Sequence, residues 1–171
     1  NQTVLSIDPE RLIEVSELVK VVSSRSKKII LIGNGGSAAM ASHVAVDFTK
    51  VAGVRAVNFN ESDLITCFAN DYGYENWVAE ALKAYADSGD LIILISSSGK
   101  SPNILNGALQ AKKMGLQVVT LSGFDSDNPL RKIGDISLWV DSKGYNIIEM
   151  THHIWLVAIV DNIIGKIEYN A

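Results

Sequence analysis

Residues 91–102 read LIILISSSGKSP, five apolar residues followed at once by three serines, a glycine, a lysine, a serine and a proline. A strand that is apolar at every position, instead of at every second one, is typical of a parallel sheet covered on both faces. A proline is favoured in the first turn of a helix. The segment therefore predicts a buried strand, a short loop and a helix, the repeating unit of α/β proteins.

The same alternation of strand and helix continues in both directions along the chain. Further strands are expected at 29–32, 55–59, 117–121 and 136–140, and helices at 9–25, 37–51, 76–86, 102–114 and 147–167. Right-handed crossovers between such strands give a three-layer α/β/α sandwich with a five-stranded parallel sheet. The length of 171 residues suits one domain over 1–171.

Composition narrows the function classes. The net charge of −4 argues against a general nucleic-acid binder, which is usually basic. The longest apolar run, 154–160, is far shorter than the roughly 20 residues that span a membrane. Cys67 is the only cysteine, and the first residues lack the pattern of a signal peptide. We therefore expect a cytoplasmic protein with neither nucleic acid nor membrane as a partner.

The serine-rich loop after residue 95 is the sharpest functional signal. Ligands of α/β proteins bind beyond the carboxyl ends of the strands. Four hydroxyls there, with the N–H groups of a helix start, suit a phosphate dianion; they belong to Ser96, Ser97, Ser98 and Ser101. An ATP-binding P-loop would need glycine at position 94, which is leucine. Ser101 as a simple helix cap before Pro102 is also possible, but a cap does not explain the other three serines.

A second loop, GNGGSAA at 33–39, also joins a strand to a helix. Its glycines allow a tight turn and a close approach of ligand to backbone, and a helix N-terminus attracts anions. Asn34, Gly35 and Ser37 are its candidate ligand contacts. The glycine spacing also matches a loose dinucleotide pattern, but no acid ends the next strand at 58–60. A purely structural turn is the third interpretation.

The two loops, with His43, ANDYGY at 69–74 and Gly89-Asp90, resemble the sugar isomerase (SIS) domain family, and within it the phosphoheptose isomerases. The resemblance covers nearly the whole chain. It implies a SIS fold, a homotetramer, and an aldose–ketose isomerase that makes heptose for surface polysaccharides such as lipopolysaccharide. It further implies a phosphorylated sugar as substrate, its phosphate held by Ser37, Ser96, Ser98 and Ser101, and its hydroxyls near Asn34 and Asp71.

The residues depart from that family on two helices. His43 is followed by Asp47, where the family has a Glu on the same helix face. On the last helix Ile148 and Leu156 stand where the family has Gln and His. A zinc ion bound through such a set would keep only two ligands, which rarely hold zinc. We therefore expect no metal and no other cofactor.

The last helix still offers acid–base groups. Aldose–ketose isomerisation needs a base that moves a proton between C1 and C2, and a second group for ring opening. The candidates for these roles are Glu149, His152, His153, His43 and Asp47. A histidine on a largely apolar helix can equally be a hydrogen-bonded core residue. The alternative function is a non-catalytic SIS module that binds sugar phosphates for regulation or protein interaction.

Overall fold

The computed structural model of the chain describes residues 3–166. Its single sheet has five parallel strands in the order β2-β1-β3-β4-β5. The strands are β1 (Ile29–Gly33), β2 (Ala56–Val57), β3 (Leu91–Ile95), β4 (Gln117–Ser122) and β5 (Ile136–Trp139). The expected five-stranded parallel sheet is confirmed.

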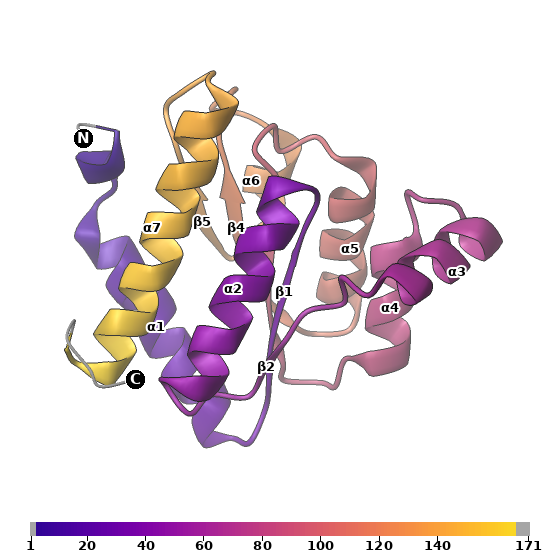
Figure 1. The fold of residues 1–171 in the computed structure, drawn as a ribbon, viewed down its shortest axis with the longest axis horizontal. Coiled ribbons are helices and arrows are strands. Elements are labelled where there is room, and N and C mark those ends of the chain that lie inside the picture. The colour runs from indigo at the N-terminus through magenta and orange to yellow at the C-terminus, as the bar shows by residue number, and fades with distance from the viewer. Residues whose placement is uncertain (1–2, 167–171) are drawn as a thin grey trace.

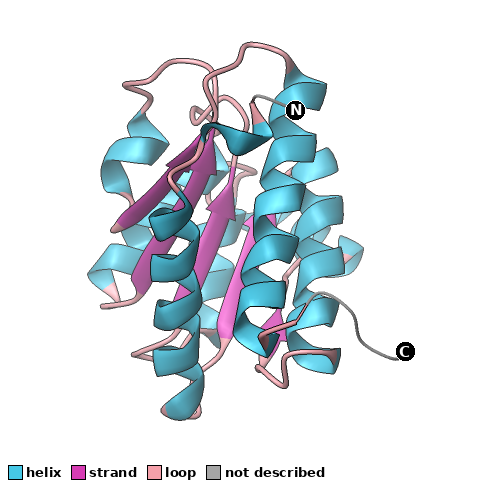
Figure 2. Cartoon of the chain, turned by 90° about the vertical axis from the view of Figure 1, so that its left-hand side faces the viewer, coloured by secondary structure: helices cyan, strands magenta, loops and turns pink. Residues whose placement is uncertain are grey.

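Helices cover both faces of this sheet, as Figures 1 and 2 show. One face carries α1 (Pro9–Ser24), α2 (Gly36–Lys50) and α7 (Tyr145–Ile164). The other carries α4 (Trp77–Tyr85), α5 (Pro102–Lys113) and α6 (Pro129–Ile133). A one-turn 3₁₀ helix, η1 (Val4–Ser6), precedes α1, and α3 (Ser62–Tyr72) lies outside α4 (Figure 1). The three-layer sandwich predicted from the sequence is confirmed.

The apolar runs divide between two cores. In β1, Ile29 and Leu31 face the α1, α2 and α7 layer, whereas Ile30 and Ile32 face the opposite layer. Successive side chains of a strand point to opposite faces, so a strand with a core on each side must be apolar throughout. All five residues of β1 and all five of β3 are buried.

Three elements differ from the sequence prediction. The strand expected at 55–59 forms only two residues of β2, at the sheet edge, where it pairs with β1 alone. Neither α3 nor α6 was predicted: α3 has no buried residue, and α6 has only five residues. The last helix is described to Ile164, and its expected end at Ile167 lies outside the described residues.

Helix α7 is long and apolar enough to cross a membrane by length and composition alone, with a mean hydropathy of 1.4. In the structure it packs on α1 and α2 as part of the sandwich (Figure 1). Its buried residues are Ile148, Thr151, His152, Trp155, Leu156, Ile159 and Val160. A helix buried in the core of a sandwich is equally apolar, so the packing of α7 explains its apolar composition.

Asp90 holds the amino-terminal edge of the sheet. Its buried carboxylate accepts hydrogen bonds from the backbone N–H groups of Lys28 (3.0 Å) and Asp87 (2.8 Å). It also pairs with the Lys28 ammonium at 2.6 Å. Gly89-Asp90, part of the family resemblance, is thus explained by the turn into β3, on the edge opposite the serine loop.

Candidate functional site

The two loops singled out in the sequence meet at the carboxyl edge of the sheet. The chain leaves β1 for α2 on one face, and leaves the adjacent β3 for α5 on the other face. The two loops therefore diverge at the carboxyl ends of β1 and β3 and leave a space between them. Such a switch point is where sheets of this type bind ligands.

A pocket of about 120 Å³ opens there. Asn34 and Ser37 line it from the loop after β1 and the start of α2. The end of β3 and the serine loop contribute Ile95, Ser96, Ser97, Ser98 and Ser101, and α7 contributes Tyr145 and Glu149. The structure thus brings one carboxylate and two polar loops, which lie far apart in the sequence, to one pocket.

The serine loop lines the pocket, and its Ser101 hydroxyl does not cap α5. The Ser98 hydroxyl accepts the backbone N–H of Lys100 at 3.2 Å. Ser101 is the N-cap residue, but its side chain accepts no backbone N–H of that helix. Its Oγ lies 3.0 Å from the Oγ of Ser96 instead. The hydroxyl of Ser97 is buried and has no hydrogen-bond partner among residues 3–166. Because buried hydroxyls normally find partners, this arrangement suits a bound oxyanion.

Two glycines of the first loop make room for polar groups of the pocket. A Cβ at Gly33 would lie 2.6 Å from the main chain of Ser37, so glycine lets the helix start fold over the strand end. A Cβ at Gly36 would lie 2.4 Å from an oxygen of the Glu149 carboxylate. Gly36 therefore lets that carboxylate sit against the first turn of α2, where the helix dipole favours negative charge.

Asn34 is fixed by two residues for which the sequence predicted no individual role. Its amide group and that of Asn103 exchange hydrogen bonds of 3.0 and 2.9 Å, and the Tyr74 hydroxyl donates to its Oδ1 at 3.2 Å. Asn103 directly follows Pro102 in the serine loop, which was a signal that could have found it. Gly35 is the exposed N-cap of α2, with φ +54°, and does not line the pocket.

Asp71 lies outside the pocket of this chain. It is exposed on α3 and accepts a 2.8 Å hydrogen bond from the Asn70 amide. Cys67, one helical turn earlier, places its sulfur 3.8 Å from the same carboxylate. Within the single chain, the structure does not bring Asp71 to the other candidate sugar contacts.

A row of polar groups runs along the contact between α7 and α2, away from the pocket. His153 follows Glu149 by one turn of α7 and packs edge-on against His43, with ring centroids 4.9 Å apart. Nε2 of His43 lies 3.2 Å from the carboxylate of Asp47. Burial and the neighbouring His43 lower the pKa of His153, and Asp47 opposes this shift.

His152 belongs to the core and not to the pocket. It is fully buried, and its Nε2 lies 3.1 Å from the backbone oxygen of Ser122. Burial lowers the pKa of His152 to about 4, so the ring is neutral at pH 7. The structure therefore supports the core interpretation of this histidine.

Ile148 and Leu156 also face the core. Both are completely buried, and Ile148 packs on Gly123, where a Cβ would lie 2.6 Å from its Cδ1. The residues of α7 that line the pocket are Tyr145 and Glu149, and Glu149 lies about 100° around the helix from Ile148.

The donor set does not fit a firmly held zinc ion. Within residues 3–166, no three side chains of His, Cys, Asp or Glu come close enough together to hold a metal. Only His43 and Asp47 of the set implied by the resemblance are neighbours. Zinc sites in proteins usually have three or four protein ligands, more than this pair supplies.

Comparison with known proteins gives consistent matches. The SIS domain family matches residues 3–123. A phosphoheptose isomerase of Sulfurimonas denitrificans is 36% identical over 159 residues, covering 90% of this chain and 80% of that relative. A probable phosphoheptose isomerase of Thermoplasma acidophilum is 34% identical over 155 residues, covering 86% of this chain and 84% of the relative.

A solved structure agrees with these relatives. The phosphoheptose isomerase of Neisseria gonorrhoeae superposes with a TM-score of 0.89 at 28% identity. The match covers 95% of this chain and 90% of that chain. The fold and nearly all its elements are therefore shared.

The buried His152 predicts an acid-sensitive stability. Its folded-state pKa of about 4 is below the ordinary 6.5, so between these values the unfolded chain binds a proton that the folded chain does not. The free energy of unfolding should therefore fall as the pH drops from about 6.5 to 4. Urea unfolding should show a loss of up to about 3 kcal/mol that His152→Gln lacks. The same pH dependence in both proteins would contradict this role.

Proposed function

The chain belongs to the SIS domain family, and we propose that it is an aldose–ketose isomerase for a sugar phosphate of the phosphoheptose class. The observation that carries this proposal is the pocket itself. One carboxylate, Glu149, shares it with the hydroxyls of the serine loop. An anion site and a base in one small pocket are the two requirements for isomerising a phosphorylated sugar.

The serine loop and the start of α5 would hold the phosphoryl group. Ser96, Ser98 and Ser101 offer hydroxyls, and the buried Ser97 hydroxyl has no hydrogen-bond partner in the part of the chain that the structure describes. The helix dipole adds positive potential at the same point. Ser37, at the first turn of α2, is placed to contribute a further hydroxyl.

Glu149 would act as the base that transfers a proton between C1 and C2. Its carboxylate lies against Gly36, on the wall of the pocket formed by α2 and α7. Asn34 would orient a sugar hydroxyl next to it. One N–H of its amide is engaged by Asn103, and the second remains to donate to the substrate.

His153, His43 and Asp47 are the candidates for ring opening. His153 lies one turn beyond Glu149, and Asp47 orients the His43 ring from 3.2 Å. The lowered pKa of His153 favours the neutral imidazole, which can accept a proton. His152, buried beneath Ser122, has no part in this scheme.

The wider setting follows from the same proposal. We infer a cytoplasmic homotetramer that needs no metal or other cofactor and supplies heptose for surface polysaccharides such as lipopolysaccharide. Neither nucleic acid nor membrane is part of the proposal. The second candidate, a sugar-phosphate-binding module without catalysis, is favoured by one observation: among the described residues, Glu149 is the only carboxylate that lines the pocket of one chain, and no histidine lines it.

Replacing Ser98 tests the phosphate site. Losing a hydrogen-bond donor to a dianion costs about 1.5–3 kcal/mol, so Ser98→Ala should weaken sugar-phosphate binding by about tenfold or more. Isothermal titration calorimetry with sedoheptulose 7-phosphate measures this. Ser88→Ala, on an exposed turn at the opposite edge of the sheet, is the control and should bind normally. Unchanged affinity in Ser98→Ala would exclude the assignment.

Replacing Glu149 tests the chemistry. Glu149→Gln keeps the shape but removes the base, so turnover should fall by about 10²–10⁴-fold while phosphate affinity stays nearly unchanged. NMR detection of isomer interconversion measures the rate, and Glu17→Gln on exposed α1 is the control. Full turnover by Glu149→Gln would refute the assignment of Glu149 as the base.

Chelation tests the metal. Treating the native protein with a chelator beforehand should leave its isomerisation rate unaltered. Activity that only added zinc restores would refute the proposal that no metal is needed.

The exposed side of α7 tests the assembly. Ile147, Met150 and Ile154 lie on one face and are 52%, 56% and 45% exposed. Apolar residues gathered in this way mark a contact between proteins, so we expect α7 to pack on α7 of another subunit. Light scattering should report a tetramer, and Met150→Glu should lower the mass. A native monomer at micromolar concentration would rule this out.

A further inference from the structure

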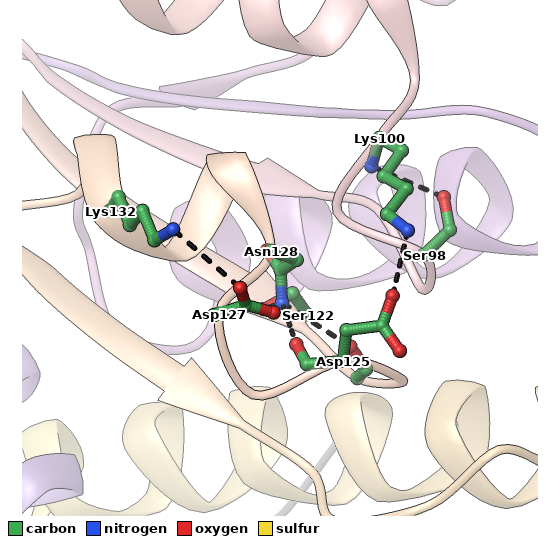
Figure 3. Close-up of polar contacts among 8 residues, drawn as sticks. Ser98, Lys100, Ser122, Asp125, Asp127, Asn128 and Lys132 are labelled. Carbon is green, nitrogen blue, oxygen red and sulfur yellow. Dashed lines mark hydrogen bonds and ion pairs between the residues drawn. The ribbon is translucent and has the colours of Figure 1, made fainter.

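The loop between β4 and α6, residues 123–128, packs directly against the serine loop. The N–H of Gly123 donates to the carbonyl of Ser97 at 2.8 Å. Just beyond the loop, the N–H of Leu130 donates to the carbonyl of Gly99 at 3.2 Å. The Lys100 ammonium reaches the carboxylate of Asp125 at 2.7 Å, as Figure 3 shows.

Asn128 is the buried centre of this contact. It is 1% exposed. Its Nδ2 lies within hydrogen-bond distance of Ser122 Oγ (3.1 Å) and of the carbonyls of Gly123 (3.3 Å) and Asp125 (2.8 Å). Its Oδ1 accepts the backbone N–H of Arg131 at 3.0 Å and caps α6. All its polar atoms are engaged, so the side chain has one fixed position (Figure 3).

Gly99 of the serine loop is shaped against that side chain. A Cβ on Gly99 would lie 2.0 Å from Oδ1 of Asn128. Gly99 also has φ +63°, a conformation that glycine adopts without strain. The turn that sends Ser98 and Ser101 toward the pocket is therefore made against Asn128, from the side away from the ligand.

We propose that Asn128 is a positioning residue for the phosphoryl group, acting through Gly99 on the hydroxyls of the serine loop. The inference rests on the phosphate site of the proposed function. Four short side chains bind a dianion well only when the loop holds them in place beforehand, because ordering a loose loop subtracts from the binding energy. No atom of Asn128 touches the pocket.

The ion pair between the side chains of the two loops stabilises their contact less than Asn128 does. The Lys100 and Asp125 side chains are 59% and 46% exposed, and exposed ion pairs stabilise little. The Asn128 contact is buried, and its hydrogen bonds continue inward. The hydroxyl of Ser122 accepts a hydrogen bond from Nδ2 of Asn128, and the backbone carbonyl of Ser122 lies within hydrogen-bond distance of the His152 ring. This chain of contacts joins the core of α7 to the serine loop.

The test measures inorganic phosphate binding by calorimetry and the steady-state kinetics of isomerisation in Asn128→Ala. We expect the Kd for phosphate and the KM for the sugar phosphate to rise together by about tenfold, with kcat changed less than about threefold. The catalytic carboxylate stands on α7 and does not depend on Gly99, which is why kcat is spared.

A matched control separates positioning from stability. Asp90 is equally buried and also binds backbone N–H groups of a loop, but at the opposite edge of the sheet. Asp90→Asn should lower the melting temperature yet leave the phosphate Kd unaltered. Should Asn128→Ala not fold, Asn128→Ser retains an oxygen for the Arg131 N–H and should show the same loss of affinity.

The outcomes are distinct. Native phosphate affinity in the folded Asn128 variants, or a fall of kcat at constant KM, would overturn the inference. Because phosphate binding is measured without turnover, a native protein that binds phosphate but isomerises nothing contradicts the proposed isomerase alone. A native protein that does not bind phosphate overturns both.

Discussion

The pairing of β1 with β3 is the contact on which the site depends. Their register runs from Ile29 opposite Leu91 to Gly33 opposite Ile95, so both strands end at the same level. The next residues, Asn34 and Ser96, therefore start their loops side by side, although 62 positions separate the strands in this register. The crossovers then depart to opposite faces and leave a gap between the loops. A slip by one residue would turn every side chain of a strand from one core to the other.

Helix α7 adds the chemistry to this gap by distributing neighbouring residues among different surroundings. Successive residues of a helix lie about 100° apart, so Ile148 enters the core, Glu149 the pocket and Met150 the exposed side. His152 and His153 separate in the same way, one beneath Ser122 and the other against His43. Since the helix is apolar nearly all round, its sequence pattern does not indicate which face is which. This is why two neighbouring histidines were equivalent candidates in the sequence and are not in the structure.

The sequence was sufficient to predict those elements whose structure is determined by a single segment of the chain. β1 and β3 were predicted because a doubly buried strand must be apolar throughout. Both loops were predicted because a cluster of glycines or of serines stands between such a strand and a helix. The sequence was not sufficient for elements whose structure depends on packing between distant segments. Helix α3 has no fully buried residue, and β2 pairs only at the sheet edge. Asn103, Tyr74 and Asn128 act through partners that are remote in sequence or through the shape of a turn, so only the folded chain shows their roles.

The serine loop shows why neutral donors need so much support. A lysine in the pocket would attract a phosphate from any direction, but the one lysine of this loop, Lys100, is bound by Asp125 on the outer side. Hydroxyls bind only in the correct direction, so their affinity is set by how rigidly the backbone holds them. That rigidity comes from Gly99 fitted against Asn128, and from Ser122 and His152 behind it. Neutral His152 is suited to this place, because a charged ring there would have to be buried among apolar side chains.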